Sequence, residues 1–141
     1  MRGKFSFCSV TCLFSAFWYL LSLAGCSNKT PPVISPEIAA EIPHDSTAFV
    51  QGLFYDAGRL FESDGLYGQS ALRVLDAQSG ALLKHVPLEP RYFGEGCAKM
   101  GETVVQLTWR EKTALTRSLA DLSPGPALMY GGEGWGLTGD G

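Results

Sequence analysis

One acidic residue is set apart by its neighbours. Glu95 lies between Gly94 and Gly96, directly after the aromatic pair Tyr92-Phe93. Carboxylates are normally kept in water, so a carboxylate among aromatic residues is a candidate for a raised pKa and for general acid–base chemistry. On this local pattern alone a turn residue is the commoner explanation. The choice depends on what the rest of the chain places around Glu95.

The surroundings of Glu95 recur along the chain. Gln51-Gly52-Leu53, Glu95-Gly96-Cys97 and Trp135-Gly136-Leu137 open three successive units, whose glycines are 44 and 40 residues apart. Between these starts lie short β-rich runs bounded by Gly, Asp or Ser, which predict strands. The runs cover residues 49–56, 59–63, 70–77, 81–88, 94–100 and 103–109, and a degenerate stretch follows at 113–122.

A period of about 40–45 residues with four strands per unit is typical of a β-propeller blade. We therefore expect an all-β fold. Strands at one equivalent position line the axis of a propeller, so Gln51, Glu95 and Trp135 are predicted to converge on one site. The glycine beside each would let backbone and ligand approach closely.

Composition limits the alternatives. The chain has 141 residues, enough for one domain, and it is 45% hydrophobic and only 18% charged, which argues against disorder. The formal charge is −3 and the pI about 5.3, so there is no basic surface to predict a nucleic-acid partner.

The N-terminal segment is predicted to be an export signal. Arg2 and Lys4 precede an uncharged apolar run from Phe5 to Leu23, and Leu23-Ala24-Gly25-Cys26 resembles the bacterial lipobox. We expect residues 1–25 to be removed, Cys26 to carry lipid, and residues 26–43 to form a tether. The protein would then be anchored to the bacterial envelope on the periplasmic side, at the outer membrane. An uncleaved membrane anchor is the alternative.

Four motifs carry a resemblance to a known family: PHDSTAFVQGLFYDAGRLFESDGLYGQSALRVLD, YFGEG, QLTW and GEGWGLTGDG. In order and spacing they resemble the plant and bacterial type of glutaminyl-peptide cyclotransferase, from about Ile42 to Gly141. Over residues 111–130 the match is poor, and the family's blade strand is replaced. The resemblance implies a five-bladed β-propeller, of which residues 44–141 would hold about two blades and the start of a third.

The family reaction converts the N-terminal Gln of a peptide into pyroglutamate and releases ammonia. The resemblance implies that Glu95 is the general acid/base. No cofactor or metal is predicted. It assigns substrate-binding roles to five further residues, four of them aromatic. These residues are Phe49, Gln51, Phe93, Trp109 and Trp135. The aromatic rings would form an apolar slot for the Gln side chain, and Gln51 could bond the substrate amide.

Structural interpretations compete with these roles. Phe49 and Phe93 could be core residues, His44-Asp45 is interpreted as a structural pair at the entry to the first blade, and Cys97 as a small buried residue. His85 is expected on the surface of a strand. Two histidines are too few to predict a zinc site.

Two other functions are left open. The protein could be a propeller lipoprotein that binds peptide or sugar without catalysis, although a binder would not require Glu95. It could also be a catalytically inactive fragment, in which the site is left open on one side. The oligomeric state is not predicted.

Overall fold

The computed structural model describes residues 31–139. The chain divides into two units after Ile38. Residues 31–38 contain no helix or strand, whereas the unit that begins at Ala39 is built from eight β-strands. None of the described residues belongs to a helix that is long and apolar enough to cross a membrane.

Four strands form the first sheet, in the order β1-β2-β3-β4 and antiparallel throughout. They are β1 (Val50–Asp56), β2 (Arg59–Asp64), β3 (Ala71–Asp76) and β4 (Leu82–Pro87). Ala57 and Gly58 join β1 to β2 in a two-residue turn, and both have positive φ angles of 47° and 82°. This is the backbone that a tight hairpin with the normal strand twist requires.

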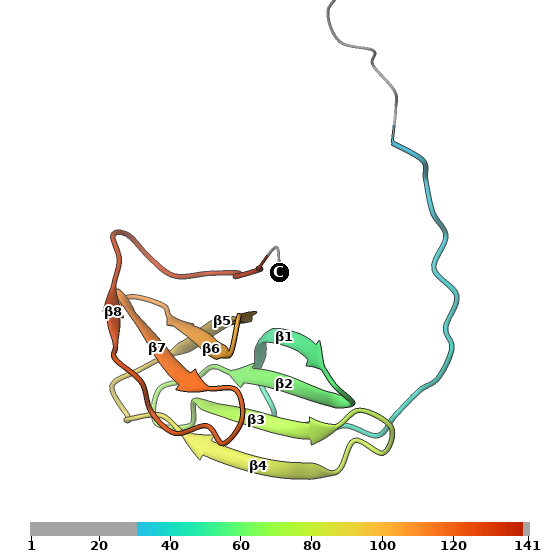
Figure 1. The fold of residues 1–141 in the computed structure, drawn as a ribbon, viewed down its shortest axis with the longest axis horizontal. Coiled ribbons are helices and arrows are strands. Elements are labelled where there is room, and N and C mark those ends of the chain that lie inside the picture. Colours follow the sequence, from blue (N-terminus) through green and yellow to red (C-terminus); the bar gives the residue numbers. More distant parts are fainter. Residues whose placement is uncertain (1–30, 140–141) are drawn as a thin grey trace, which may run out of the picture. The chain divides into compact units, whose positions relative to one another are not determined.

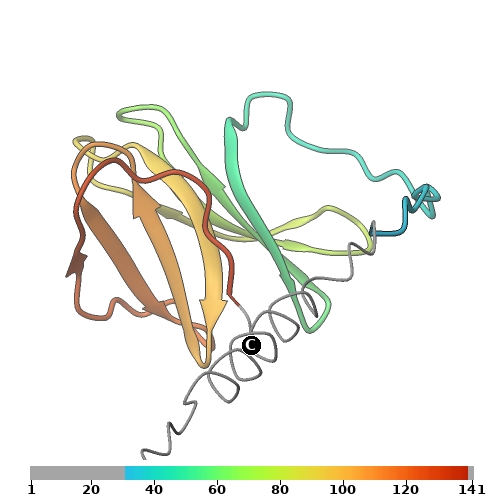
Figure 2. The same ribbon diagram turned by 90° about the horizontal axis from the view of Figure 1, so that it is seen from above.

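The second sheet repeats the first, in the order β5-β6-β7-β8. Its strands are β5 (Gly94–Met100), β6 (Thr103–Thr108), β7 (Thr113–Ser118) and β8 (Leu128–Met129). Figure 1 labels the strands β1 to β4 of the first sheet and β5 to β8 of the second. Figure 2 shows that β5 of the second sheet lies next to β1 of the first. The predicted all-β fold is confirmed, and its two similar sheets agree with part of a propeller-like fold.

The stretch at 113–122, which is degenerate in sequence, begins with a regular strand. Thr113–Ser118 forms β7 and pairs with β6 in unbroken register, from Thr103↔Ser118 to Leu107↔Ala114. Thr113 and Thr116 are β-branched residues of the kind that suit a pleated, half-buried strand. The shortened strand is β8, which makes only two pairs with β7.

The hydrophobic core lies between the two sheets. Phe61, Leu72 and Val74 of the first sheet pack with Val104 of the second sheet and with Leu119 and Leu122, which follow β7. Phe54 stacks on Phe61 with ring centroids 4.6 Å apart. Because each sheet buries one face against the other, packing between the two sheets stabilises both of them.

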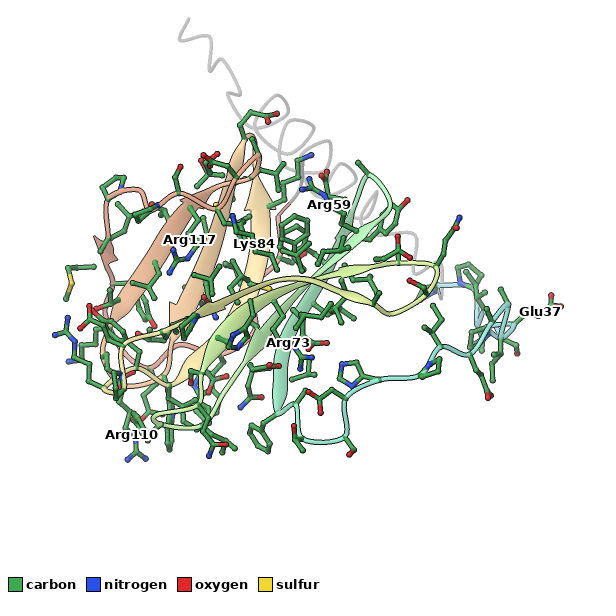
Figure 3. All side chains as sticks on the ribbon, turned by 90° about the horizontal axis from the view of Figure 1, so that it is seen from below. Glu37, Arg59, Arg73, Lys84, Arg110 and Arg117 are labelled. Atoms are coloured by element: carbon green, nitrogen blue, oxygen red, sulfur yellow. The ribbon has the colours of Figure 1, made fainter. Side chains whose placement is uncertain are left out.

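Charged side chains occupy the other face of the first sheet. The buried Arg73 guanidinium lies 3.2–3.4 Å from the carboxylates of Asp45, Glu62 and Asp64. His44 Nε2 is 2.7 Å from a Glu62 oxygen. Figure 3 shows Arg73 in the middle of this sheet. His44 and Asp45 thus fasten the segment before β1 onto the sheet, which confirms their structural interpretation.

Two further interpretations are also confirmed. Cys97 is buried, and burial raises the pKa of its thiol to about 12. It is therefore a small core residue and not a nucleophile at neutral pH. His85 lies exposed on β4.

The second sheet carries an open apolar groove of about 480 Å³. Met100, Leu128, Met129 and Trp135 line it and are each about half exposed or more.

Candidate active site

Glu95 lies in a β-bulge. Pairing between β5 and β6 is irregular between Gly94 and Cys97, so the chain around Glu95 bends out of the regular ladder. Pairing between β1 and β2 is irregular at the equivalent place, between Val50 and Gly52. Bulges redirect a side chain away from the alternation of a strand. Gln51 and Glu95 therefore lie in equivalent β-bulges of the first and second sheets.

The glycines beside Glu95 allow three backbones to meet. A Cβ added at Gly94 would lie 2.5 Å from the carbonyl oxygen of Asp64, and one at Gly96 would lie 2.5 Å from that of Trp135. Gly96 N–H also donates a 2.8 Å hydrogen bond to Trp135 O. Glu95 is thus held between β2 of the first unit and the segment of the third repeat. The sequence predicted a close approach of backbone and ligand at these glycines, whereas in the structure the approaching groups are the backbones of Asp64 and Trp135.

Glu95 is a buried residue, although its carboxyl oxygens are not among the completely enclosed polar atoms that lack a partner. Only 4% of the residue is exposed, and its side chain has no hydrogen-bond or ion-pair partner within residues 31–139. Burial raises the pKa of Glu95 above its ordinary value, because the charged form loses its hydration. A carboxyl group in this state can accept a proton at one step and return it at the next.

Four of the predicted pocket residues form one continuous row of rings. Phe49 meets Phe93 edge-on with centroids 6.3 Å apart, Phe93 meets Trp109 at 5.5 Å, and Trp109 meets Trp135 at 6.0 Å. The ends of the row are open, since Phe49 is 48% and Trp135 58% exposed. Phe49 is therefore not a core residue.

Gln51 lies beside this row. A Cβ at Gly65 would be 3.1 Å from Gln51 Cγ and 2.6 Å from a Phe93 ring atom, so Gly65 leaves the space in which the two side chains meet. The half-buried Gln51 amide makes no hydrogen bond to other residues of the described range. Its amide is free to bind a polar group.

Backbone bonds align the row. Gly65 N–H donates to Phe49 O at 2.8 Å, and Trp109 N–H donates to Phe93 O at 2.9 Å, which is the same bond in successive units. Trp109 Nε1 donates to a Glu133 carboxylate oxygen at 3.1 Å, and the Arg110 guanidinium lies 3.7 Å from the centroid of the Trp109 ring. These contacts fix the orientation of Trp109.

Sequence reasoning missed two residues at this site. Tyr67 packs against Phe93 with centroids 5.3 Å apart, and Glu111 accepts hydrogen bonds from the Tyr67 hydroxyl at 2.8 Å and from Phe93 N at 3.4 Å. The 44-residue period could have paired them, because 67 and 111 are equivalent positions. No group of three His, Cys, Asp or Glu residues in the range 31–139 is arranged to hold a metal ion.

Repeated antiparallel sheets with a buried carboxyl group beside an aromatic row define an all-β protein with a candidate acid–base site. Residues 11–141 match the model of a family described as glutamine cyclotransferase, and the chain belongs to that family.

Two relatives are similar over most of this chain. A glutaminyl-peptide cyclotransferase of Arabidopsis thaliana is 44% identical over 108 residues, which are 74% of this chain and 33% of that protein. A crystal structure of the glutaminyl cyclase of Myxococcus xanthus superposes with a TM-score of 0.64 at 38% identity, over 72% of this chain and 43% of that one. This chain thus spans less than half the length of either relative.

Proposed function

We propose that this protein forms pyroglutamate from the N-terminal Gln of peptides and releases ammonia, with Glu95 as the general acid/base. The names of its relatives support this activity. The observation that carries the role of Glu95 is its burial without a partner, at a bulge beside the aromatic row. A buried carboxyl group without a partner is costly to keep, so a chemical task is the simplest account of it.

The reaction needs one proton to move between two nitrogen atoms. The uncharged α-amine attacks the side-chain carbonyl carbon of the same Gln, and a C–N bond forms. The proton that the amine loses passes to the Glu95 carboxylate. Glu95 then gives this proton to the amide nitrogen, the old C–N bond breaks, and ammonia leaves. Catalysis of this kind contributes about 10²–10⁴ in rate.

The remaining residues would position the substrate. The rings of Phe93, Trp109 and Trp135 offer an apolar wall for the methylene groups of the substrate Gln, and the free amide of Gln51 can bond its carboxamide. Holding the amine against the carbonyl adds a proximity contribution to the rate. The wall also limits hydration of Glu95, which keeps its pKa raised.

We also propose that the whole protein is a five-bladed β-propeller and an exported lipoprotein. The propeller is supported by the 44-residue repeat and by the two similar sheets. Export is supported by the sequence alone, because Cys26 and the signal at 1–25 lie outside the described residues. In this proposal Cys26 carries the lipid, residues 26–43 form the tether and residues 44–141 belong to the catalytic domain.

Replacing Glu95 tests the catalytic proposal. Glu95→Gln keeps the size of the side chain and removes the proton acceptor, so kcat should fall by about 10²–10⁴ with little change in substrate affinity. Ammonia and pyroglutamate released from a Gln-peptide are measured. Glu102→Gln, in the exposed turn between β5 and β6, is the matched control and should keep the unmutated rate. Near-normal turnover by Glu95→Gln, or none by the unmutated protein, contradicts the proposal.

A further inference from the structure

Tyr67 and Glu111 form a pair that the proposed reaction does not use. Tyr67 lies in the loop between β2 and β3, and Glu111 lies in the equivalent loop between β6 and β7. The Tyr67 hydroxyl donates a 2.8 Å hydrogen bond to Glu111 Oε1. Repeat-equivalent residues of neighbouring repeats thus meet beside Phe93, within the aromatic row.

The backbone of both loops is held in an unfavourable conformation. Leu66 and Gly68, on either side of Tyr67, have φ angles of 78° and 76°, and Lys112, next to Glu111, has φ 54°. Left-handed backbone at Leu66 and Lys112 costs free energy and persists only where surrounding contacts enforce it. Such residues concentrate at binding sites, where the strained loop presents a side chain in a fixed position.

The pair is accessible and borders the row. Tyr67 is 48% exposed although its ring packs against Phe93, and Glu111 is half-buried. Glu111 Oε2 accepts a 3.4 Å hydrogen bond from Phe93 N–H, so both loops are tied to the strand that leads into Glu95. The Tyr67 ring therefore extends the row beyond the four predicted aromatic residues.

Glu111 differs from its acidic neighbours in its charge balance. Glu89 pairs with Arg91 at 2.9 Å and Glu133 pairs with Arg110 at 3.5 Å. Within residues 31–139, no Lys, Arg or His side chain lies within 4.0 Å of the Glu111 carboxylate. Figure 3 shows the labelled Arg110 at this end of the second sheet. Glu111 thus makes no ion pair within residues 31–139, although the charge of the neighbouring Arg110, which pairs with Glu133, also acts on Tyr67.

We propose that Tyr67 and Glu111 form a subsite for a Lys or Arg side chain at the second position of the substrate, a proposal that rests on the proposed function. An exposed ring beside a carboxylate binds a cation by combining a cation–π contact with an ion pair. An apolar side chain would gain only the ring contact and would lie against an unpaired charge.

The reach of the substrate agrees with this position. Phe93 precedes Glu95 by two residues in the chain, and the centroid of the Tyr67 ring lies 5.3 Å from that of the Phe93 ring. One peptide residue advances about 3.5 Å. In the proposal the Gln lies at Glu95, and the side chain of the second residue extends toward Tyr67. Lys and Arg combine a long side chain with the positive charge that Glu111 would bind.

The test measures binding and does not depend on turnover. The probes are two product peptides, pyroglutamyl-lysyl-glycinamide and pyroglutamyl-norleucyl-glycinamide, which share a four-carbon stem and differ in the ammonium group. Their affinities for the full chain are determined by isothermal titration calorimetry at low salt. We expect the lysyl peptide to bind about 3- to 10-fold more tightly, from the summed ring and ion-pair contacts. The preference should shrink as salt is added.

Matched variants assign the preference to the pair. Glu111→Gln keeps the acceptor for Tyr67 and should abolish the preference, Tyr67→Leu should reduce it, and Tyr67→Phe should retain most of it. Glu89 is an exposed carboxylate that already pairs with Arg91, so Glu89→Gln should leave the preference for the lysyl peptide unchanged. Equal affinity of the two peptides for the unmutated protein, no binding of either, or a preference that survives Glu111→Gln would overturn the proposal. A lysine preference in a protein without cyclase activity would support the subsite and refute the reaction.

Discussion

The environment of Glu95 serves its proposed chemistry at a cost to folding. Burial disfavours the charged carboxylate, and no cation or hydrogen-bond donor within residues 31–139 offsets this. The pKa of Glu95 is therefore higher in the folded state than in the unfolded chain. Because the folded state holds this proton more tightly, the contribution of Glu95 to stability is most favourable at low pH. It is lost as the pH rises from the unfolded pKa, near 4.5, through the folded one.

The loss of this stability contribution with rising pH can be tested by replacing Glu95. Glu95→Gln cannot ionise, so its free energy of unfolding relative to the unmutated protein should rise between pH 4 and pH 7. Urea unfolding of both proteins at a series of pH values gives the difference directly, and taking the difference cancels groups that titrate in both, such as Asp64. A difference that is flat or falls with pH would show that Glu95 is not desolvated.

Single residues could be predicted from the sequence where a motif surrounded them. Glu95 was found from its glycines and aromatic neighbours. Tyr67 and Glu111 were missed, because each alone resembles a surface loop residue and only the packing of two units brings them together. The buried cluster around Arg73 was also missed, since a charged residue in a strand is normally assigned to the solvent face.

At the scale of elements, the site depends on how closely neighbouring units pack. Gly52 of β1 lies against Gly96 and Cys97 of β5, and Gly96 in turn lies against Leu137 and Trp135. The same glycine thus makes the same contact in two consecutive repeats. This repetition places the bulges with Gln51 and Glu95 side by side.

Adding one methyl group should disturb this junction. A Cβ at Gly52 would lie 2.9 Å from Gly96 Cα, in rigid backbone on both sides. Gly52→Ala should therefore lower the free energy of unfolding by about 1–3 kcal/mol. Gly131→Ala, where an added Cβ meets nothing within 4 Å, is the control and should change stability little. Denaturant unfolding checks both, and equal stability of the two variants would mean that the units are not in close contact at Gly52.

Most strand positions followed from the sequence for a physical reason. Short β-rich runs punctuated by Gly, Asp and Ser predicted β1 to β6 within a few residues, since turn residues fix where a strand can end. β7 lies in the stretch that is degenerate in sequence, and its six residues still pair with β6. The bulges were not predicted, because a bulge depends on the partner strand.

The whole molecule is predicted to be attached to a membrane. If Cys26 is acylated after removal of residues 1–25, the unmutated protein should incorporate a labelled fatty acid in a bacterial host, and Cys26→Ala should not. Cys97→Ala is the control: its thiol is buried with a pKa of about 12, so this change should leave labelling intact. Persistent labelling of Cys26→Ala would refute the lipoprotein proposal.

The contact between Trp109 and Trp135 gives the molecule an optical property of its own. The chain has three tryptophans, and the third, Trp18, lies in the segment proposed to be removed on export. All indole emission of the mature protein would then come from two rings 6.0 Å apart at the candidate site. Rings this close exchange excitation, so near-ultraviolet circular dichroism and fluorescence report on the site rather than on an average over the fold. Occupancy of the aromatic row can thus be followed spectroscopically without any introduced label.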